Sequence, residues 1–373
     1  MPRRESAGAN TLANLAEEAG GLELPVLGRM GLGHIPRLLP AGRMIEGVPP
    51  CDAPNACFGA MREVSVGKDT TTGHWEMAGL RLATGFHVFP PGPPAFPVSL
   101  IADLEEKTGR KCIGNKAASG TAIIQELGPR QMRDKCWIVY TSADSVLQIA
   151  AHEEIIPLPE LYRACEIARG LCDRYMVGRV IARPYVGLPG GFTRTPNRRD
   201  FSYPLPGPTI LDSIVRSGIQ CTAIGKIDDI FNHRGFTQTL HSEANAIAES
   251  DLLSLLGQGA SGFIFANLID FDMLYGHRRD AAGYAAALKR ADAFLGEMLP
   301  FLHTDDLLII TADHGNDPTF TGTDHTREYV PLLVYGRGRG GVNLGIRNGF
   351  YDVAQTVASY FGLKPMPLGL SFL

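Results

Sequence analysis

Short apolar runs that each end at a polar residue alternate along this chain with amphipathic stretches, and this alternation constrains the fold more than any other feature. The runs cover residues 136–141, 221–224, 262–268 and 307–311. The amphipathic stretches, whose apolar residues recur at helical spacing, cover residues 160–171, 208–217, 241–256 and 280–299. Strands that alternate with helices indicate an α/β fold with a mostly parallel sheet flanked by helices.

Two clusters of proline and glycine divide the chain. They cover residues 90–97 and residues 187–208, where the chain is expected to change direction or domain. The segment between them, on the order of 110 residues, has the size of a small domain. We predict a discontinuous core of residues 1–88 and 206–373, with residues 89–205 inserted as a cap that contributes to substrate binding.

The composition argues against several classes of partner. The 373 residues include 35 Lys and Arg against 39 Asp and Glu, with a formal net charge of -4 and no long block of either sign. We therefore expect neither nucleic acid nor a membrane surface as a partner. Seven cysteines without a CxxC pair predict reduced thiols, and we see neither a membrane-spanning run nor a signal peptide. These features predict a cytoplasmic location.

Five candidate metal ligands follow the last two apolar runs. They are Asp272, His277, Asp313, His314 and His325. Carboxylates and imidazoles suit a divalent cation that handles phosphate, and open α/β sheets bind ligands at the carboxyl ends of their strands. Asp313 and His314 are adjacent, so they would point to opposite faces of a regular strand. We therefore expect the strand to break here, which Gly315 and Asn316 permit.

A nucleophile candidate lies in the segment GKDTTTGHWE, residues 67–76. A threonine hydroxyl is a poor nucleophile at its own pKa, but a metal lowers that pKa and orients the oxygen. The segment is not a Walker sequence, because no glycine lies five residues before Gly67. A threonine-rich turn alone is more often a capping device, so this segment indicates catalysis only in combination with the metal ligands.

Several motifs resemble those of bacterial phosphopentomutases. They read GKDTTTGHWEMAGL, TSADSVLQIAAHEE, GRVIARPYVG, FTRTPNRRD, AIGKIDDI, LIDFDMLYGHRRD and TADHGNDPTFTGTDHTREYVPLL. The resemblance covers nearly the whole chain and implies an alkaline phosphatase superfamily fold. It also implies an isomerase, an intramolecular phosphotransferase that interconverts ribose 1-phosphate and ribose 5-phosphate and also acts on deoxyribose phosphates. The implied cofactors are two Mn²⁺ ions, and the implied partners are small-molecule sugar phosphates. The oligomeric state stays open.

The resemblance also implies roles for single residues. Thr70 would be the phosphothreonine, which passes its phosphoryl group to the bound sugar phosphate through a pentose 1,5-bisphosphate. One metal would be bound by Asp272, His277 and His325, and the other by Asp313 and His314. The sugar phosphate would be bound by Ser142, Asp144, Arg179, Ile181 and Lys226. A basic cluster of Arg194, Arg198 and Arg199 could meet an incoming phosphate first, or form only a solvated loop.

The sequence departs from the family at its start. Phosphopentomutases begin with a buried strand that ends in an Asp-Ser motif, whose aspartate binds the same metal as Asp313 and His314. Here residues 8–15 already resemble the first helix of the family, and no such strand precedes them. We expect weaker metal binding and poor stability from the sequence as it stands, and our hypothesis is that the true start codon lies upstream.

Alternatives remain open. The metal ligands also suit another superfamily member, such as a cofactor-independent phosphoglycerate mutase or a phosphomonoesterase. A third interpretation is an inactive, truncated remnant that binds metal or sugar phosphate without turnover.

Overall fold

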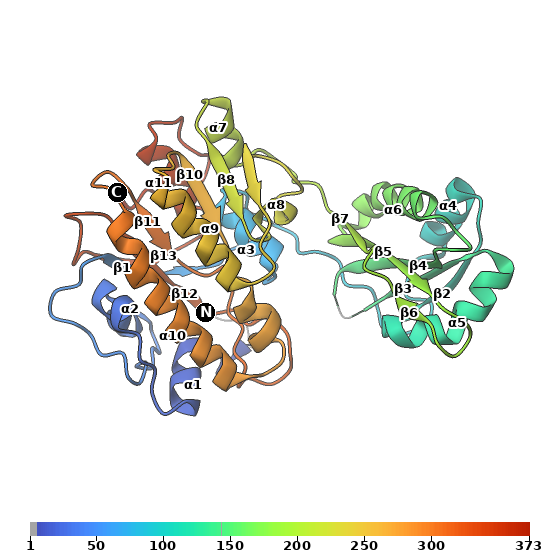
Figure 1. Cartoon of the computed structure of the whole chain (residues 1–373), viewed down its shortest axis with the longest axis horizontal. Helices are drawn as coiled ribbons and strands as arrows, with labels where there is room; N and C mark the ends of the chain where they lie inside the picture. The colour runs from blue at the N-terminus through green and yellow to red at the C-terminus, as the bar shows by residue number, and fades with distance from the viewer. Residues whose placement is uncertain (1–5, 143) are drawn as a thin grey trace. The chain divides into compact units, whose positions relative to one another are not determined.

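The computed structural model describes residues 6–142 and 144–373, which form two compact units (Figure 1). Of the described residues, 6–84 and 206–373 form the core unit, and 85–142 and 144–205 form the inserted unit. From the proline-rich residues 90–97 we predict the first boundary between residues 88 and 89. The observed boundary, between residues 84 and 85, lies a few residues earlier. Each unit is described below by itself.

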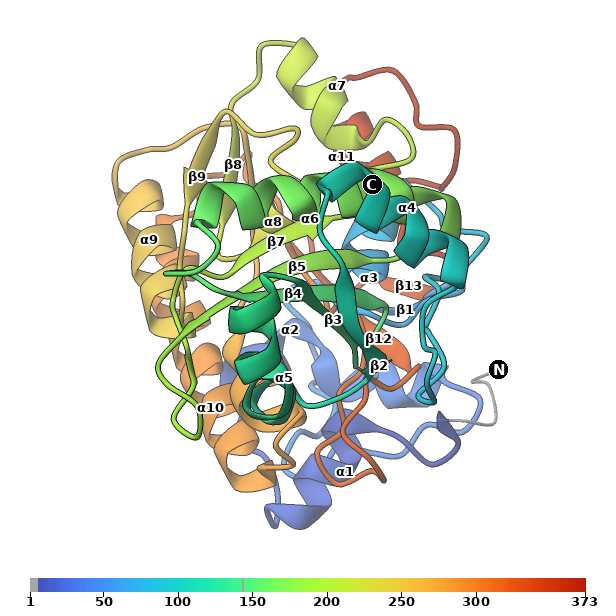
Figure 2. The same ribbon diagram turned by 90° about the vertical axis from the view of Figure 1, so that its right-hand side faces the viewer.

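The inserted unit is a mixed sheet covered by helices on both faces (Figure 2). Its strands are β2 (Cys112–Ala117), β3 (Trp137–Thr141), β4 (Val146–His152), β5 (Arg179–Val186), β6 (Thr193–Arg194) and β7 (Arg199–Ser202). Its helices are α4 (Val98–Thr108), α5 (Gly120–Asp134), α6 (Leu158–Cys172) and the short 3-10 turn η3 (Asp173–Tyr175). The strand order is β2-β3-β4-β5-β6, and β7 also pairs with β5.

The two faces of this sheet bury different side chains. Trp137 and Val180 pack with α4 and α6, whereas Tyr140 and Tyr185 pack with α5. Figure 2 shows α6 above the strands and α5 below them. Because successive side chains of a strand point to opposite faces, residues of β5 with odd numbers share the α5 face of the sheet with Tyr185.

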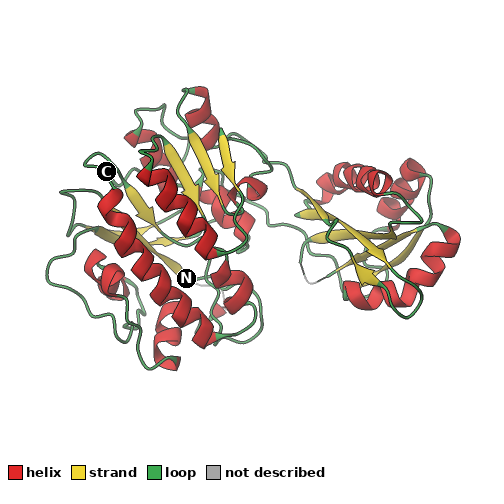
Figure 3. Cartoon of the chain, viewed as in Figure 1, coloured by secondary structure: helices red, strands yellow, loops and turns green. Residues whose placement is uncertain are grey.

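The core unit contains two separate sheets (Figure 3). Its strands are β1 (Cys57–Arg62), β8 (Cys221–Ile224), β9 (Gln238–Leu240), β10 (Phe263–Ala266), β11 (Leu308–Ile310), β12 (Tyr329–Tyr335) and β13 (Asn343–Arg347). One sheet has the order β11-β12-β1-β13, and the other has the order β10-β8-β9.

Helices flank both sheets of the core unit. They are α1 (Thr11–Glu18), α2 (Pro25–Met30), α3 (Thr70–Met77), α7 (Ile210–Arg216), α8 (Ile227–Ile230), α9 (Asn245–Gly257), α10 (Ala281–Met298) and α11 (Asp352–Tyr360). Shorter turns are η2 (Leu32–Leu38), η4 (Phe271–Gly276) and η5 (Leu299–Phe301). Leu333 of β12 packs with Met30 of α2 and Leu295 of α10, whereas its neighbour Leu332 packs on the other face with Met77 of α3.

The α/β class is confirmed, and three of the five strand pairings among the described residues of the core unit are parallel, as predicted for the core. Half of the ten strand pairings in the described residues are antiparallel. A parallel pair requires a long crossover, whereas the short link between β3 and β4 allows an antiparallel return.

Two other sequence expectations concern cysteines and membrane spans. All seven cysteines are free, as predicted. Among the described helices, none has both the length and the apolar character that crossing a membrane demands.

Candidate metal centre

A π-helical turn brings Asp272 and His277 together. The turn η4 follows β10, and the backbone N–H of His277 donates to the carbonyl of Asp272 over 3.2 Å. This i→i+5 hydrogen bond defines a π-helix, which is often found at functional sites. Oδ2 of Asp272 consequently lies 3.2 Å from Nε2 of His277. A spacing of five residues thus places both side chains on one side of the turn.

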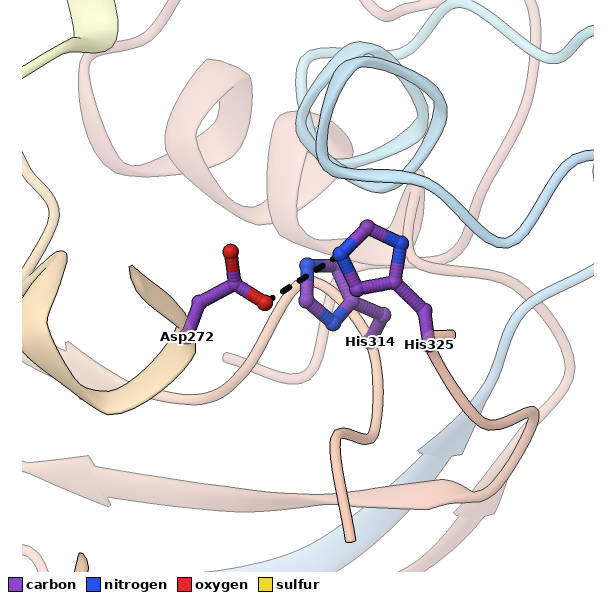
Figure 4. Close-up of side chains that lie close together, drawn as sticks. All are labelled: Asp272, His314 and His325. Carbon is purple, nitrogen blue, oxygen red and sulfur yellow. Dashed lines mark hydrogen bonds and ion pairs between the residues drawn. The ribbon is translucent and has the colours of Figure 1, made fainter. Parts of the chain in front are cut away.

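His325 reaches the same carboxylate from a distant part of the chain (Figure 4). Its Nε2 lies 3.1 Å from Oδ1 of Asp272. The neighbouring Asp324 forms an ion pair with Lys68 at 2.8 Å, which links the His325 loop to the loop before α3. Two segments separated by about fifty residues therefore converge on one carboxylate.

Asp313 and His314 follow β11 on irregular backbone. The strand ends at Ile310, and no regular strand continues through Asp313. The predicted break is therefore confirmed, and both side chains point to one region. Nε2 of His314 lies 3.1 Å from Oδ2 of Asp313, and the rings of His314 and His325 are 3.9 Å apart between centroids.

Thr70 is the first residue of α3, and its hydroxyl lies inside this cluster. Oγ1 of Thr70 is 3.1 Å from Nε2 of His314. Asp69 begins the helix as its N-cap, because its side chain accepts the backbone N–H of Thr72 at 3.1 Å. Gly73 lets the helix approach Asp313 closely, since a Cβ at residue 73 would lie 2.1 Å from the Asp313 carbonyl oxygen.

The donor atoms suit a divalent cation. One ligand atom each from Asp272, His314 and His325 lie within 4.8 Å of one another. Nδ1 of His277 lies 2.7 Å from a backbone carbonyl, that of Thr323, and Nδ1 of His314 lies 3.1 Å from the Gly315 carbonyl. These hydrogen bonds assign the ring proton to Nδ1 and leave Nε2 as a ligand, an orientation typical of metal-binding histidines.

The electrostatics of the cluster favour ionised carboxylates. Burial alone raises the pKa of Asp272, but hydrogen bonds from His277 and His325 outweigh burial and leave that pKa well below its usual value. Burial likewise raises the pKa of Asp313, and the charges of His314 and His74 reverse this effect. Burial lowers the pKa of His314, yet the Asp313 charge raises it overall to about 9. A cation that binds here must therefore displace histidine protons.

The structure does not divide the five ligands into two separate sets. It brings all five into one contiguous cluster, because Asp272 joins the first set to His325 and His314 stacks on His325. The division into one site of three ligands and one of two stays a prediction from the resemblance.

Three neighbours of the cluster were not predicted from sequence. His74 lies four residues after Thr70 on α3; its Nδ1 is 3.2 Å from Oδ2 of Asp313. Asn316 donates from Nδ2 to Oδ1 of Asp272. Arg327 pairs with buried Glu63 at 3.0 Å and donates to the carbonyls of residues 66 and 67, which holds the loop before α3. The spacing of His74 from Thr70 along one helix was the available signal.

Lys226 is the one predicted substrate residue in the core unit. It follows β8, and its Nζ contacts Sδ of Met273, the residue after Asp272, at 2.6 Å. The structure therefore places the lysine against the residue that follows the candidate ligand Asp272.

The other predicted substrate residues belong to the inserted unit. Ser142 and Asp144 flank residue 143, which lies outside the described residues. Arg179 begins β5 and approaches Asp144 at 3.9 Å, while Ile181 is buried in the same strand. The three polar residues thus group within this unit, but their role toward a substrate stays a prediction.

Several solved structures are similar to this chain at low sequence identity. Solved structures similar to this chain include a Pyrococcus horikoshii protein, at 13% identity over 99% of this chain and 96% of that chain, with a TM-score of 0.49. A Leishmania mexicana phosphoglycerate mutase is 19% identical over 45% of this chain and 39% of its own, with a TM-score of 0.37. A mutant alkaline phosphatase is 12% identical over 83% of this chain and 89% of its own, with a TM-score of 0.33.

Residues 215–365 match the sequence profile of the Metalloenzyme superfamily. The five candidate ligands all lie inside this range, whereas Thr70 lies outside it. Residues 215–365 therefore resemble a Metalloenzyme superfamily domain, and this similarity implies a divalent-metal site among the candidate ligands.

Proposed function

We propose that this chain is a phosphopentomutase, which interconverts (deoxy)ribose 1-phosphate and (deoxy)ribose 5-phosphate through phosphorylated Thr70. The observation that supports this most directly is the 3.1 Å contact between the Thr70 hydroxyl and Nε2 of His314. A hydroxyl held against a metal-ligand histidine is placed for phosphoryl transfer, which fits a mutase in combination with the family motifs.

The cluster would hold two divalent ions, Mn²⁺ by resemblance. Asp272, His277 and His325 would hold one ion, and Asp313 and His314 the other. When bound, such ions neutralise charge on a transferring phosphoryl group and lower the pKa of a nearby hydroxyl. The carboxylate and imidazole donors would also accept zinc, magnesium or iron.

The side chains of the protein would carry the phosphoryl group and position it. In the first half-reaction the bond from phosphorus to Thr70 Oγ1 breaks and a bond to the free sugar hydroxyl forms; that hydroxyl loses its proton and the threonine oxygen gains one. The first-turn N–H groups of α3 favour a phosphate on Thr70. Lys226 would pair with phosphate oxygens as a point charge. Ser142, Asp144, Arg179 and Ile181 are proposed to bind the sugar phosphate.

The proposal includes a further strand between β10 and β11. Among the described strands, each of these two pairs on one side only, and each leads into the metal centre. The side chains of both strands are only partly buried, whereas those of β8 are fully buried. A strand paired with both would satisfy their open edges and deliver its last residue beside Asp313 and His314. The resemblance places a metal-binding aspartate there.

The first test is turnover of ribose 1-phosphate to ribose 5-phosphate with Mn²⁺, with phosphate release followed in parallel. We expect isomerisation without phosphate release, and phosphate on Thr70 by mass spectrometry. Thr70→Val should abolish both the isomerisation and the phosphorylation of the protein. The matched control Thr71→Val, one position along the same helix, should retain both activities. Phosphate release without isomerisation would instead indicate a phosphomonoesterase.

A second comparison tests the proposed strand between β10 and β11. The chain extended through the upstream codons should bind metal more tightly and turn over faster than the 373-residue chain. Equal activity of the two would show that another group replaces the aspartate. Inactivity of both, with a single metal per chain, would indicate a disabled site.

A further inference from the structure

We propose that the inserted unit carries an anion site of its own at the N-terminus of α5, formed by Tyr140, Arg183 and Arg194 and suited to a phosphomonoester dianion. It lies wholly within this unit, and binding there does not depend on the chemistry of Thr70. The observations that support it concern the helix end, the charges around it and one buried hydroxyl.

The N-terminus of α5 lacks the groups that normally satisfy a helix start. The helix has 15 residues, no side-chain hydrogen bond from its N-cap Ser119, and no acidic residue in its first turn. The first internal backbone bond is donated by Ile123, so the N–H groups of Gly120 and Thr121 have no acceptor among the described residues. Unsatisfied N–H groups at the positive end of a helix dipole bind anions.

A guanidinium group occupies the place where an anion would be expected. A Cβ on Gly120 would lie 1.5 Å from Nη2 of Arg194, so the guanidinium rests against the helix end only because residue 120 is glycine. Two positive groups thus lie close together, and no ion pair of Arg194 is present among the described residues. The side chain of Arg194 is exposed, so an anion can approach it from solvent.

The surroundings add further positive charge. Burial lowers the pKa of Arg183, and the charges of Arg198 and Arg194 lower it further. Asp200 is the acidic group that opposes this effect, but it already receives two hydrogen bonds of 2.6 Å from Arg198 and lies 3.6 Å from Arg179. A dianion with several oxygens would satisfy guanidinium groups and helix N–H groups together.

A buried hydroxyl points to the same spot. Tyr140 has 0% of its surface exposed, and its hydroxyl meets the geometry of a hydrogen bond with none of the described residues. Burial raises the pKa of this hydroxyl, and the nearby Arg194 guanidinium opposes the rise. That hydroxyl would lie 2.5 Å from a Cβ on Gly120, so it faces the first turn of α5. A buried donor without a partner is costly and is uncommon unless a ligand completes it.

The site shares one face of the sheet with a predicted substrate residue. Strand register places Tyr140 of β3 opposite Gln148 of β4, and Gln148 opposite Ile181 of β5. Arg183 projects on this face beside them and donates from Nε to Gln148 at 3.0 Å. Two strand spacings, roughly 10 Å, separate Tyr140 from Ile181, so an anion at α5 could be the phosphate of a sugar phosphate or a separate ion.

The test is titration of the full-length, metal-free protein with inorganic phosphate and with ribose 5-phosphate, followed by the backbone amide signals of Gly120 and Thr121. Chelation suppresses binding at the metal centre. We expect both amides to shift with saturation. Arg194→Gln should weaken phosphate binding by about tenfold or more, since a charged hydrogen-bonding partner is lost. The matched control Arg174→Gln should leave it unchanged, because that guanidinium pairs with Asp103 and lies over the ring of Tyr175 on the other face of the sheet.

Tyr140→Phe separates binding from folding. It removes only the unpartnered hydroxyl, so the phosphate-free protein should melt at the same temperature or higher, while the rise in Tm caused by phosphate should shrink. If Arg194→Gln weakens binding of both probes, the site serves a sugar phosphate; if it weakens inorganic phosphate alone, the site serves a free ion. Amides that do not shift, or affinities that neither variant changes, would overturn the proposal.

Discussion

The contact between α3 and the backbone of Asp313 gives a sharp prediction for Gly73→Ala. The added Cβ would lie 2.1 Å from the Asp313 carbonyl oxygen and 2.8 Å from its carbonyl carbon. Real contacts of this kind need at least about 3 Å, so helix and loop must separate by roughly 1 Å. Overpacking of this kind costs about 1–3 kcal/mol, and the better helix propensity of alanine returns up to about 1 kcal/mol. We expect a net loss of about 1–2 kcal/mol in the free energy of unfolding.

The same displacement should affect activity more than stability. Thr70 begins the displaced helix, and a misplacement of about 1 Å can reduce turnover about 100-fold. Urea unfolding and the mutase assay measure the two effects. Gly170→Ala is the matched control, because Gly170 lies in α6 and a Cβ added there would have nothing within 4 Å; it should gain up to about 1 kcal/mol and keep its activity. A Gly73→Ala protein as stable and active as the parent would refute the close contact.

Further predictions concern pH, metal and the helix cap. Burial raises the pKa of Glu63 from 4.5 to about 9 in the folded protein. The folded state therefore holds this proton more tightly than the unfolded state, and the resulting stabilisation is complete below pH 4.5 and is lost as pH rises toward 9. Glu63→Gln should therefore gain stability relative to the parent across this range, by up to about 1.4 kcal/mol per pH unit in urea unfolding, whereas exposed Glu106→Gln should show no trend. A chelator should lower Tm, because metal at a thousand times its Kd adds about 4 kcal/mol, and Asp272→Asn should lose most of that response. Asp69→Ala removes the cap of α3 and should cost about 1 kcal/mol in the same unfolding assay; an unchanged midpoint would contradict the cap.

The sequence predicts the local parts of this structure better than the non-local ones. The strand predicted at residues 221–224 is β8, and the strand break before Asp313 is present. Both follow from signals within a few residues, namely apolar runs and turn-forming residues. The split into two sheets and the mixed strand directions depend on pairings between segments far apart in the chain, which a pattern in one sequence does not specify. His74 was missed because its spacing of four residues from Thr70 along one helix is a weak signal, which gains meaning only when the fold places Asp313 beside it.

Helix α3 explains how candidate ligands that follow β10 and β11, two strands that do not pair with each other, come together. Gly73 lets the helix contact the backbone of Asp313, which follows β11, while the His74 ring packs against Phe265 of β10 with centroids 5.7 Å apart. The helix therefore contacts the ends of both sheets, and its first residue is Thr70. Because one rigid element fixes both sets of ligands and the proposed nucleophile, a change that shifts α3 should alter metal binding and phosphoryl transfer together. A change confined to the His325 loop should alter metal binding first.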